Sequence, residues 1–440
     1  MFFFIENNKK HEASWKHILD LYKLDSNIDD VKLLPRLTAE HVIPEKIKKM
    51  KVRNASQVLS QRVSSIMHFL ASKNILDENA QDTAIFCLFF DKLFDSVNGC
   101  FNKIEDGKIF RTSFKTNSPH HQLWIDSLKI LETMPPTLKN WSKTIKGFQE
   151  VYKVLKNSGV HSILLRNFNQ DSIENFFGAM KALGYRNNNP TCSSFASSYK
   201  TLLLNNLMSA HSPGSNCEED SGEGCLTSYK SLFSVYNDVD TLEPEHDSVV
   251  ERISDGPEKI SICNSELLND LGNLTKNYIA GYVVKKLNTI LFKDCKTCLS
   301  QICSTSLTKD HDVTLARDYN PDGKYLLKYP KSTFCLLVQQ TIDLISKKLP
   351  SLCHHKTLKT ELYKIIQNEL NCNFINCSAH GKIFPEKFVN FLIKLMVHNW
   401  CTQINRILSG KIKLGENETD PIKLSAYCRY VTFSKKKSFK

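Results

Sequence analysis

Apolar residues recur three and four positions apart along most of this 440-residue chain, the spacing that gathers side chains on one face of an α-helix. Helices are predicted for Ser14 to Lys23, Ala39 to Ala71, Ala80 to Asn98, Trp141 to Leu155, Asp171 to about Leu183, Leu267 to Leu291, Ser332 to Lys348, Leu358 to Leu370 and Pro385 to Leu408. A short extended piece, Ser162 to Arg166, predicts a strand. The pattern therefore indicates a mainly α protein.

The helical pattern stops in residues 211 to 260, which are rich in Ser, Gly, Asp and Glu and poor in apolar residues. This composition is typical of a flexible linker and marks a domain boundary. The segment holds twelve acids and three basic residues, a local charge of −9, and because the whole chain stands at +12 the remainder carries +21. Such basic surface suits a polyanion such as nucleic acid, although solubility alone explains many basic clusters.

Composition excludes several classes of protein. The longest apolar runs, such as Thr83 to Phe90, are far shorter than a membrane-spanning helix, so no membrane partner is expected. Met1 to Ile5 is followed at once by charge and does not make a signal peptide. The fifteen cysteines are odd in number and lack a disulfide-framework rhythm, which favours an intracellular protein. No local signature of a Ser-His-Asp or Cys-His hydrolase is present.

The run from Asn169 to Gly178 reads Asn-Gln-Asp-Ser-Ile-Glu-Asn-Phe-Phe-Gly. Asp171 and Glu174 stand three positions apart, so on a helix their carboxylates project from neighbouring points of one face. Phe176 and Phe177 can anchor another face of that helix in a core. An ordinary amphipathic helix with acids in its first turn, where they complement the helix dipole, explains the same pattern.

This run, followed by Asn-Asn-Asn-Pro-Thr at residues 187–191, resembles the segment that carries the last catalytic acid of P-element-type transposases, a group that includes the THAP-domain transposases. Two more segments resemble the guanine-nucleotide-binding insertion domain of that family, and another, with the later Cys-x-x-Cys, resembles its C-terminal region. They are Leu33 to Thr38 with Lys48 to Val52 and Ser60, Lys92 to Asn98, and Tyr278 to Val283 with Lys285 to Leu287. Taken in order, these motifs are specific.

The resemblance implies a mainly α architecture in four parts. They are an all-helical GTP-binding insertion domain at residues 1–140, the C-terminal part of a split RNase H-like catalytic domain at 141–210, an acidic disordered linker at 211–262 and a helical C-terminal domain at 263–440. Catalytic cores of this DDE type use three carboxylates to hold two Mg²⁺ ions for DNA cleavage and strand transfer. Glu174 matches the third acid, whereas the first two aspartates and the THAP domain would precede residue 1. We therefore expect a truncated transposase that does not cut DNA alone.

The resemblance also assigns contacts to GTP. The matching positions are Arg36 and Lys51 for the phosphates, Asp95 and Asp171 for the base, Val52 and Ser60 for further contacts, and Asp91, where an amide is usual. A carboxylate suits guanine because its Watson–Crick edge offers two adjacent donors, whereas adenine offers one donor and one acceptor. The sequence has no Walker-type glycine loop, so side chains must hold the phosphates. Basic and acidic side chains on solvated helix faces are the alternative reading.

Transposon-end DNA, GTP and, for a full-length form, a second copy of the protein are the partners that the resemblance implies. A nuclear location follows from the DNA partner. With Asp171 toward the nucleotide and Glu174 toward metal and DNA, nucleotide binding is expected to order their helix, and Lys181 is expected to face phosphate. The alternative is a domesticated nuclear protein that keeps its nucleotide and DNA contacts but has no catalytic activity.

Cys295-x-x-Cys298 and Cys377-x-x-His380 supply four ligands of the types that bind Zn²⁺ tetrahedrally. The two halves are far apart in the sequence, and rival partners are available in Cys303, Cys372, His354 and His355. Reduced, partly buried cysteines explain the same residues. The sequence leaves both readings open.

Overall fold

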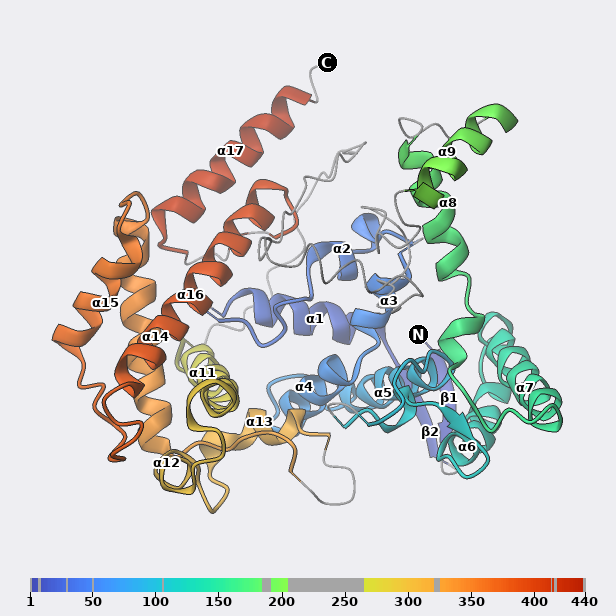
Figure 1. Ribbon diagram of the computed structural model, residues 1–440, viewed down its shortest axis with the longest axis horizontal. Helices are drawn as coiled ribbons and strands as arrows, with labels where there is room; N and C mark the ends of the chain where they lie inside the picture. The colour runs from blue at the N-terminus through green and yellow to red at the C-terminus, as the bar shows by residue number, and fades with distance from the viewer. Residues whose placement is uncertain are drawn as a thin grey trace.

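The computed structural model describes residues 2–6, 9–28, 31–49, 51–104, 107–183, 191–204, 265–319, 325–412, 414 and 418–437. Most of these residues are helical and the strands are short, so the prediction of a mainly α protein is confirmed (Figure 1). The predicted linker and the motif at 187–190 lie outside the described residues.

The N-terminal part begins with a β-hairpin and continues mainly as helices. Its elements are β1 (Phe2–Glu6), β2 (Lys9–Ala13), α1 (Trp15–Ser26), α2 (Ala39–Val42), η1 (Pro44–Lys46), α3 (Val52–Val58), α4 (Gln61–Ser72), α5 (Ala80–Val97), η2 (Ile109–Arg111), β3 (Phe114–Lys115), α6 (His120–Glu132), α7 (Pro136–Asn157), β4 (Ser162–Ile163), η3 (Leu165–Phe168), α8 (Asp171–Leu183) and α9 (Cys192–Leu204). β1 pairs antiparallel with β2, with Phe2 opposite Ala13, and β3 pairs antiparallel with β4. The hairpin, α6 and α9 have no counterpart among the sequence predictions.

The apolar stretch between Ala39 and Ala71 is divided into separate elements. Pro44 follows α2, and proline disfavours helical backbone at the residue before it. The hydroxyl of Ser60 then caps α4, accepting from the backbone N–H of Val63 at 3.4 Å and donating to the carbonyl of Gln57 at 2.8 Å. α3 and α4 are therefore two helices, although their apolar spacing is continuous.

The C-terminal part consists of α11 (Ser265–Leu287), the π-helical turn η5 (Asn288–Phe292), α12 (Lys296–Ile302), η6 (Lys309–His311), α13 (Asp312–Arg317), α14 (Ser332–Leu352), α15 (Leu358–Glu369), α16 (Phe384–Leu408) and α17 (Pro421–Lys437). Helices α11, α14, α15 and α16 follow the predicted ranges closely, whereas α12, α13 and α17 were not predicted. Among the described residues no helix combines the length and the apolar character that crossing a bilayer requires.

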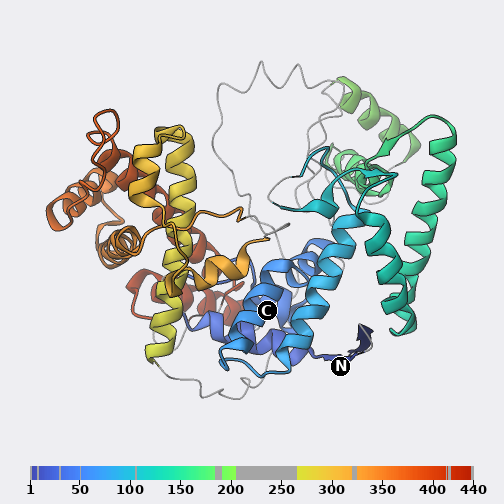
Figure 2. The ribbon, with the colours of Figure 1, turned by 90° about the horizontal axis from the view of Figure 1, so that it is seen from below.

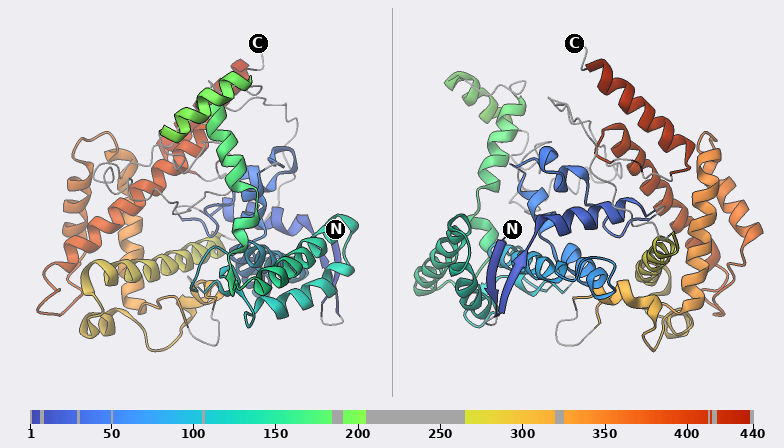
Figure 3. Two further views of the ribbon diagram at one scale, coloured as in Figure 1. Left: turned by 45° about the vertical axis from the view of Figure 1, so that its right-hand side comes forward. Right: turned by 180° about the vertical axis from the view of Figure 1, so that it is seen from behind.

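Three hydrophobic clusters hold these elements together. One surrounds the buried Trp124 of α6, a second joins α1, α4 and α5, and the third joins α11, α14, α15 and α16. The second cluster also contains Leu271 and Val313, so the C-terminal part packs directly against the N-terminal helices. Figures 2 and 3 show the C-terminal helices on one side of the α1–α5 body and α6 and α7 on the other.

Two buried side chains, Asp25 and Arg317, bind the backbone at Leu33 and Leu34, after α1. The carboxylate of Asp25 accepts hydrogen bonds from the backbone N–H groups of Leu33, at 2.6 Å, and Leu34. Burial raises the pKa of Asp25. Arg317, at the end of α13, donates to the carbonyl of Leu33. The bond from Arg317 holds α13 against the N-terminal helices.

Candidate functional site

Among the described residues, a cavity lies between α4, α5, the turn at η2 and α13. It encloses about 850 Å³, a volume typical of sites for small organic ligands. Its polar lining includes Gln61 and Ser64 of α4, Asp91 and Asp95 of α5, Lys108 and Tyr319. Two of the seven residues predicted to contact nucleotide, Asp91 and Asp95, therefore lie in this cavity.

The helical spacing of α5 positions these two acids. Phe86, Phe90 and Leu93 are buried in the hydrophobic cluster around Trp124, while Asp91 and Asp95, one turn apart, face the cavity. Asp95 is only 7 % exposed, so it is not a solvated surface acid. Burying a carboxylate requires compensating partners.

Basic residues from the following turn supply this compensation. The ammonium group of Lys108 donates to Oδ2 of Asp95 at 2.7 Å and lies 3.9 Å from Oδ1 of Asp91. Nε of Arg111 lies 4.0 Å from Oδ1 of Asp95. Gly107 makes the turn with φ +77°, and a Cβ there would meet the Tyr319 side chain at 2.8 Å. Glycine is thus required to bring Lys108 to the acids.

The pKa of Asp91 is raised to about 6, mainly by burial, with Lys108 opposing the shift and the charge of Asp95 adding to it. At neutral pH Asp91 is therefore ionised at a cost in free energy. Burial removes its solvation, and Lys108 compensates only partly because that lysine lies closer to Asp95. An amide at this position would avoid that penalty.

Replacing Asp91 with asparagine is expected to stabilise the nucleotide-free chain at pH 8. The pKa of Asp91 is about 6 in the fold and 3.8 for an ordinary aspartate. Folding therefore takes up a proton between these values, and stability falls as pH rises through that window. Above pH 6 the full penalty is on the order of 1–3 kcal/mol, which asparagine removes. Denaturant unfolding at several pH values measures the gain, which should shrink steadily toward pH 4.

Asp126→Asn provides the matched control, since Asp126 is exposed on α6 and the charge change is the same. A gain for the Asp91 variant that equals the gain for the control, or that does not depend on pH, would contradict the electrostatic explanation.

Two further groups complete the cavity. Gln61 is 8 % exposed, and no described residue donates a hydrogen bond to its side-chain oxygen. Burial and the charges of Asp91 and Asp95 raise the pKa of Tyr319, so its phenol stays protonated. The cavity thus offers a buried acceptor and two carboxylates beside an aromatic ring. Sequence reasoning missed Gln61, Lys108 and Tyr319 because only folding brings them together, although Gly107 before a lysine is a weak signal for a tight turn.

The four other predicted nucleotide contacts whose side chains are described, Arg36, Lys51, Val52 and Ser60, lie outside the lining of this cavity. Arg36 borders a smaller cavity of about 330 Å³. Lys51 precedes α3, Val52 begins it and is 52 % exposed, and the hydroxyl of Ser60 caps α4. Burial lowers the pKa of Arg36, and so do the charges of two neighbouring arginines, Arg62 and Arg53.

Glu174 is exposed in the first turn of α8, and Lys181 is exposed in its last turn. Asp171 begins this helix, but its side chain lies outside the described part of the structure. The amide of Asn169 donates to the side-chain oxygen of Asn98 at 3.4 Å. The start of α8 is therefore tied to the C-terminal end of α5, close in the chain to Asp95.

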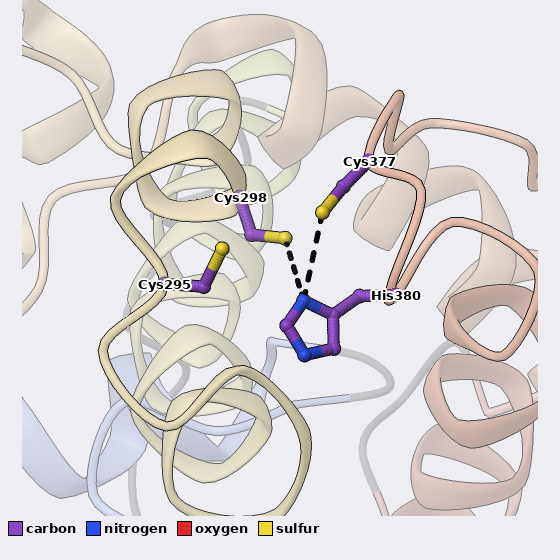
Figure 4. A group of neighbouring side chains, drawn as sticks. All are labelled: Cys295, Cys298, Cys377 and His380. Atoms are coloured by element: carbon purple, nitrogen blue, oxygen red, sulfur yellow. Dashed lines mark hydrogen bonds between the residues drawn. The ribbon is translucent and has the colours of Figure 1, made fainter.

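Among the described residues no group of three carboxylates lies close enough to hold a metal ion. Glu174 by itself does not fit a two-metal site, which requires several carboxylate ligands. No step of DNA cleavage is therefore assigned to the described residues. In contrast, the four predicted zinc ligands, Cys295, Cys298, Cys377 and His380, lie together (Figure 4). The rival candidates Cys303, Cys372, His354 and His355 are not part of this group.

Two segments of this chain match models of known protein families. Residues 2–108 match the family model described as TNP-like, GTP-binding insertion domain, and residues 167–200 match the one described as TNP-like, RNase H C-terminal domain. The first segment contains Asp91, Asp95 and Lys108, and the second contains Glu174.

A curated relative is the transposable element P transposase of Drosophila melanogaster, 25% identical over 272 residues, which are 59% of this chain and 35% of the relative. The chain thus spans about a third of that relative. A solved Drosophila P element transposase strand transfer complex has a TM-score of 0.41 and 23% identity, covering 47% of this chain and 48% of the other. Over two separate segments this chain is therefore similar to a TNP-like GTP-binding insertion domain and an RNase H C-terminal domain, and a P transposase is its homologue.

Proposed function

We propose that this chain is the guanine-nucleotide-binding and DNA-binding portion of a P-element-type DNA transposase. The observation that supports this most strongly is the pair of buried acids, Asp91 and Asp95, facing a nucleotide-sized cavity within the segment that matches a GTP-binding domain. The proposed division of the chain keeps the predicted bounds, with the insertion domain at 1–140, the RNase H-like part at 141–210, the linker at 211–262 and the C-terminal domain at 263–440.

The lining of the cavity favours guanine over adenine. A carboxylate of Asp95 accepts from the two adjacent N–H donors of guanine, and it would repel the acceptor nitrogen of adenine. The side-chain oxygen of Gln61 is a further buried acceptor that needs a donor. Lys108 can leave Asp95 for the sugar or phosphate when the base binds, since its side chain is long and only partly buried. The hydrogen-bond acceptors of Asp95 and Gln61 thus select guanine, and binding requires no hydrolysis of the nucleotide.

The phosphates are proposed to extend toward the arginines beside the cavity. The charge of Arg62 acts both on Arg36 and on Tyr319 of the cavity wall, so Arg62 lies near each of them. Arg53 and Arg62 repel the charge of Arg36, and a bound polyphosphate would relieve that repulsion. Lys51, Val52, Ser60 and Asp171 remain proposed contacts from the family resemblance.

Hydrogen–deuterium exchange locates the nucleotide directly. GTP should slow amide exchange in residues 91–98 and 107–111, and also in 312–319, because α13 and Tyr319 form the opposite wall. ATP at the same concentration is the control and should protect these segments much less. Protection confined to the smaller cavity, around residues 31–37 and 395–406, would overturn the assignment.

DNA is the second proposed partner, and α7 is the surface that supports it. Its exposed lysines are Lys139, Lys143, Lys146, Lys153 and Lys156, against the single acid Glu150. The double variant Lys143→Glu with Lys146→Glu should weaken duplex binding and reduce its dependence on salt. The control pair, Lys359→Glu with Lys364→Glu on α15, makes the same charge change on the far side of the molecule (Figure 1). Equal losses of DNA affinity in the two double variants would show that the effect comes from net charge and not from the surface of α7.

Glu174 is proposed as the single catalytic carboxylate that this chain contributes to a DDE-type, Mg²⁺-dependent core. A full-length form is proposed to act in the nucleus as an oligomer. The chain by itself should bind DNA without cutting it, which incubation with duplex DNA and Mg²⁺ tests. The alternative is a domesticated protein without catalytic activity. An in-frame segment upstream of Met1 with two aspartates on predicted strands would favour the transposase, and stop codons there would favour the alternative.

A further inference from the structure

Four side chains from two distant segments converge in the C-terminal part of the structure (Figure 4). Cys295 precedes α12 and Cys298 lies in its first turn, while Cys377 and His380 lie in the connection between α15 and α16. One ligand atom from each residue lies within 4.8 Å of the other three. The two pairs are about eighty residues apart in the sequence, and His380 contacts Cys298 across 82 positions.

The distances are those of ligands around a small tetrahedral ion. Nδ1 of His380 is 3.3 Å from Sγ of Cys298 and 3.7 Å from Sγ of Cys377. A tetrahedron with Zn–S bonds of about 2.3 Å and Zn–N bonds of about 2.1 Å requires sulfur–nitrogen separations of about 3.6 Å. Nδ1 of His380 therefore needs to move by only a few tenths of an ångström relative to these two sulfurs to share an ion with them, and all four ligand atoms lie within 4.8 Å of one another.

The backbone of each half is shaped to present its ligands. The Cys377 carbonyl accepts a hydrogen bond from the N–H of Gly381 at 2.8 Å, which closes a tight knuckle around the Cys-x-x-His pair. A Cβ on Gly381 would lie 2.7 Å from the carbonyl oxygen of Ile375, so only glycine fits after His380. Cys298 is fixed by α12, where it is fully buried. A turn on one side and a helix on the other thus hold the two pairs.

A second contact fixes the two halves to each other. The side-chain amide of Gln301 on α12 donates to the carbonyl of Asn376 at 3.1 Å and accepts from its backbone N–H at 2.7 Å. The ring of His380 also packs edge-on against Phe292, with ring centroids 5.9 Å apart. Metal ligands are commonly oriented by such supporting contacts.

We propose that Cys295, Cys298, Cys377 and His380 bind one Zn²⁺ ion in a closed structural site that staples α12 to the start of α16. Three thiolates and one imidazole in tetrahedral array are typical of zinc, and a fourth protein ligand leaves no position open for catalysis. The ion joins segments that both border the large C-terminal hydrophobic cluster, so its role is to stabilise that part of the fold.

Metal analysis of the purified full chain tests the site. About one zinc ion per chain is expected, falling several-fold in Cys298→Ser and in Cys377→Ser. Cys303→Ser is the matched control, since Cys303 directly follows α12 but is not one of the four residues, and it should keep its zinc. A chelator should lower the midpoint of thermal unfolding of the unaltered chain and of the control. It should leave the midpoints of Cys298→Ser and Cys377→Ser unchanged.

Cobalt substitution of the unaltered chain gives a result that does not depend on whether a variant folds. Bound Co²⁺ should show the intense visible bands of a tetrahedral ion and the charge-transfer absorption of thiolate ligands, and added zinc should displace it. The proposal would be overturned by a purified chain that contains no metal and whose three thiols and one imidazole titrate freely, or by variants that keep as much zinc as the control. An octahedral cobalt spectrum would overturn it too.

Discussion

An Asp95→Asn chain is expected to bind GTP about 10 to 100 times more weakly than the unaltered chain, because one or two charge-assisted hydrogen bonds to the base are lost. An amide presents one acceptor and one donor where guanine has two donors, so one pair becomes a donor facing a donor. The buried position of Asp95, 7 % exposed, makes water a poor substitute for the lost bond. Titration with a fluorescent guanine nucleotide measures the change.

The same substitution should reduce the preference for guanine over adenine, since an amide suits both bases about equally. Asp126→Asn, exposed on α6, is the control and should bind GTP normally. If the Asp95 variant bound GTP as tightly as the Asp126 variant, the base would not lie against α5.

Trp124→Ala is expected to destabilise the chain by about 3–5 kcal/mol. The substitution removes the largest fully buried side chain among the described residues and leaves a cavity in the core. The indole ring stacks on Phe114 with centroids 4.6 Å apart, and its N–H donates to the hydroxyl of Ser96 at 2.8 Å. Ser96 is adjacent to Asp95, so the variant should also loosen the end of α5 and weaken GTP binding. Denaturant unfolding and nucleotide titration measure the two effects.

Ile125→Ala tests whether the loss comes from burial. Ile125 is the next residue on α6 and is 47 % exposed, so its truncation should change stability by less than about 0.5 kcal/mol. Comparable losses for the two variants would show that α6 faces the core differently.

The sequence predicted the long helices because their apolar faces repeat over several turns. Helices α5, α14, α15 and α16 are of this kind, and their ends lie within a few residues of the predicted ones. Short helices such as α12 and α13 complete too few turns for a period to emerge. The hairpin Phe2 to Ala13 was missed because its apolar residues run together in one strand instead of alternating.

The candidate sites were predictable to different extents. Cys-x-x-Cys and Cys-x-x-His spacing indicated all four residues of the cysteine cluster, because ligand spacing is a local property, but only folding could show that the halves meet. Asp91 and Asp95 came from a family resemblance. Lys108 reaches these acids through a turn, and Tyr319 lies after α13, more than two hundred residues further along the chain, so no local pattern encodes these contacts.

Guanine nucleotide is proposed to bind the cavity between α4, α5 and α13. Calorimetric titrations of the full chain with GTP and with ATP test this most directly. GTP should bind at one site per chain and at least about 10 times more tightly than ATP, since the lining offers acceptors to the base. Equal affinity for the two nucleotides, or no binding of GTP, would contradict the claim.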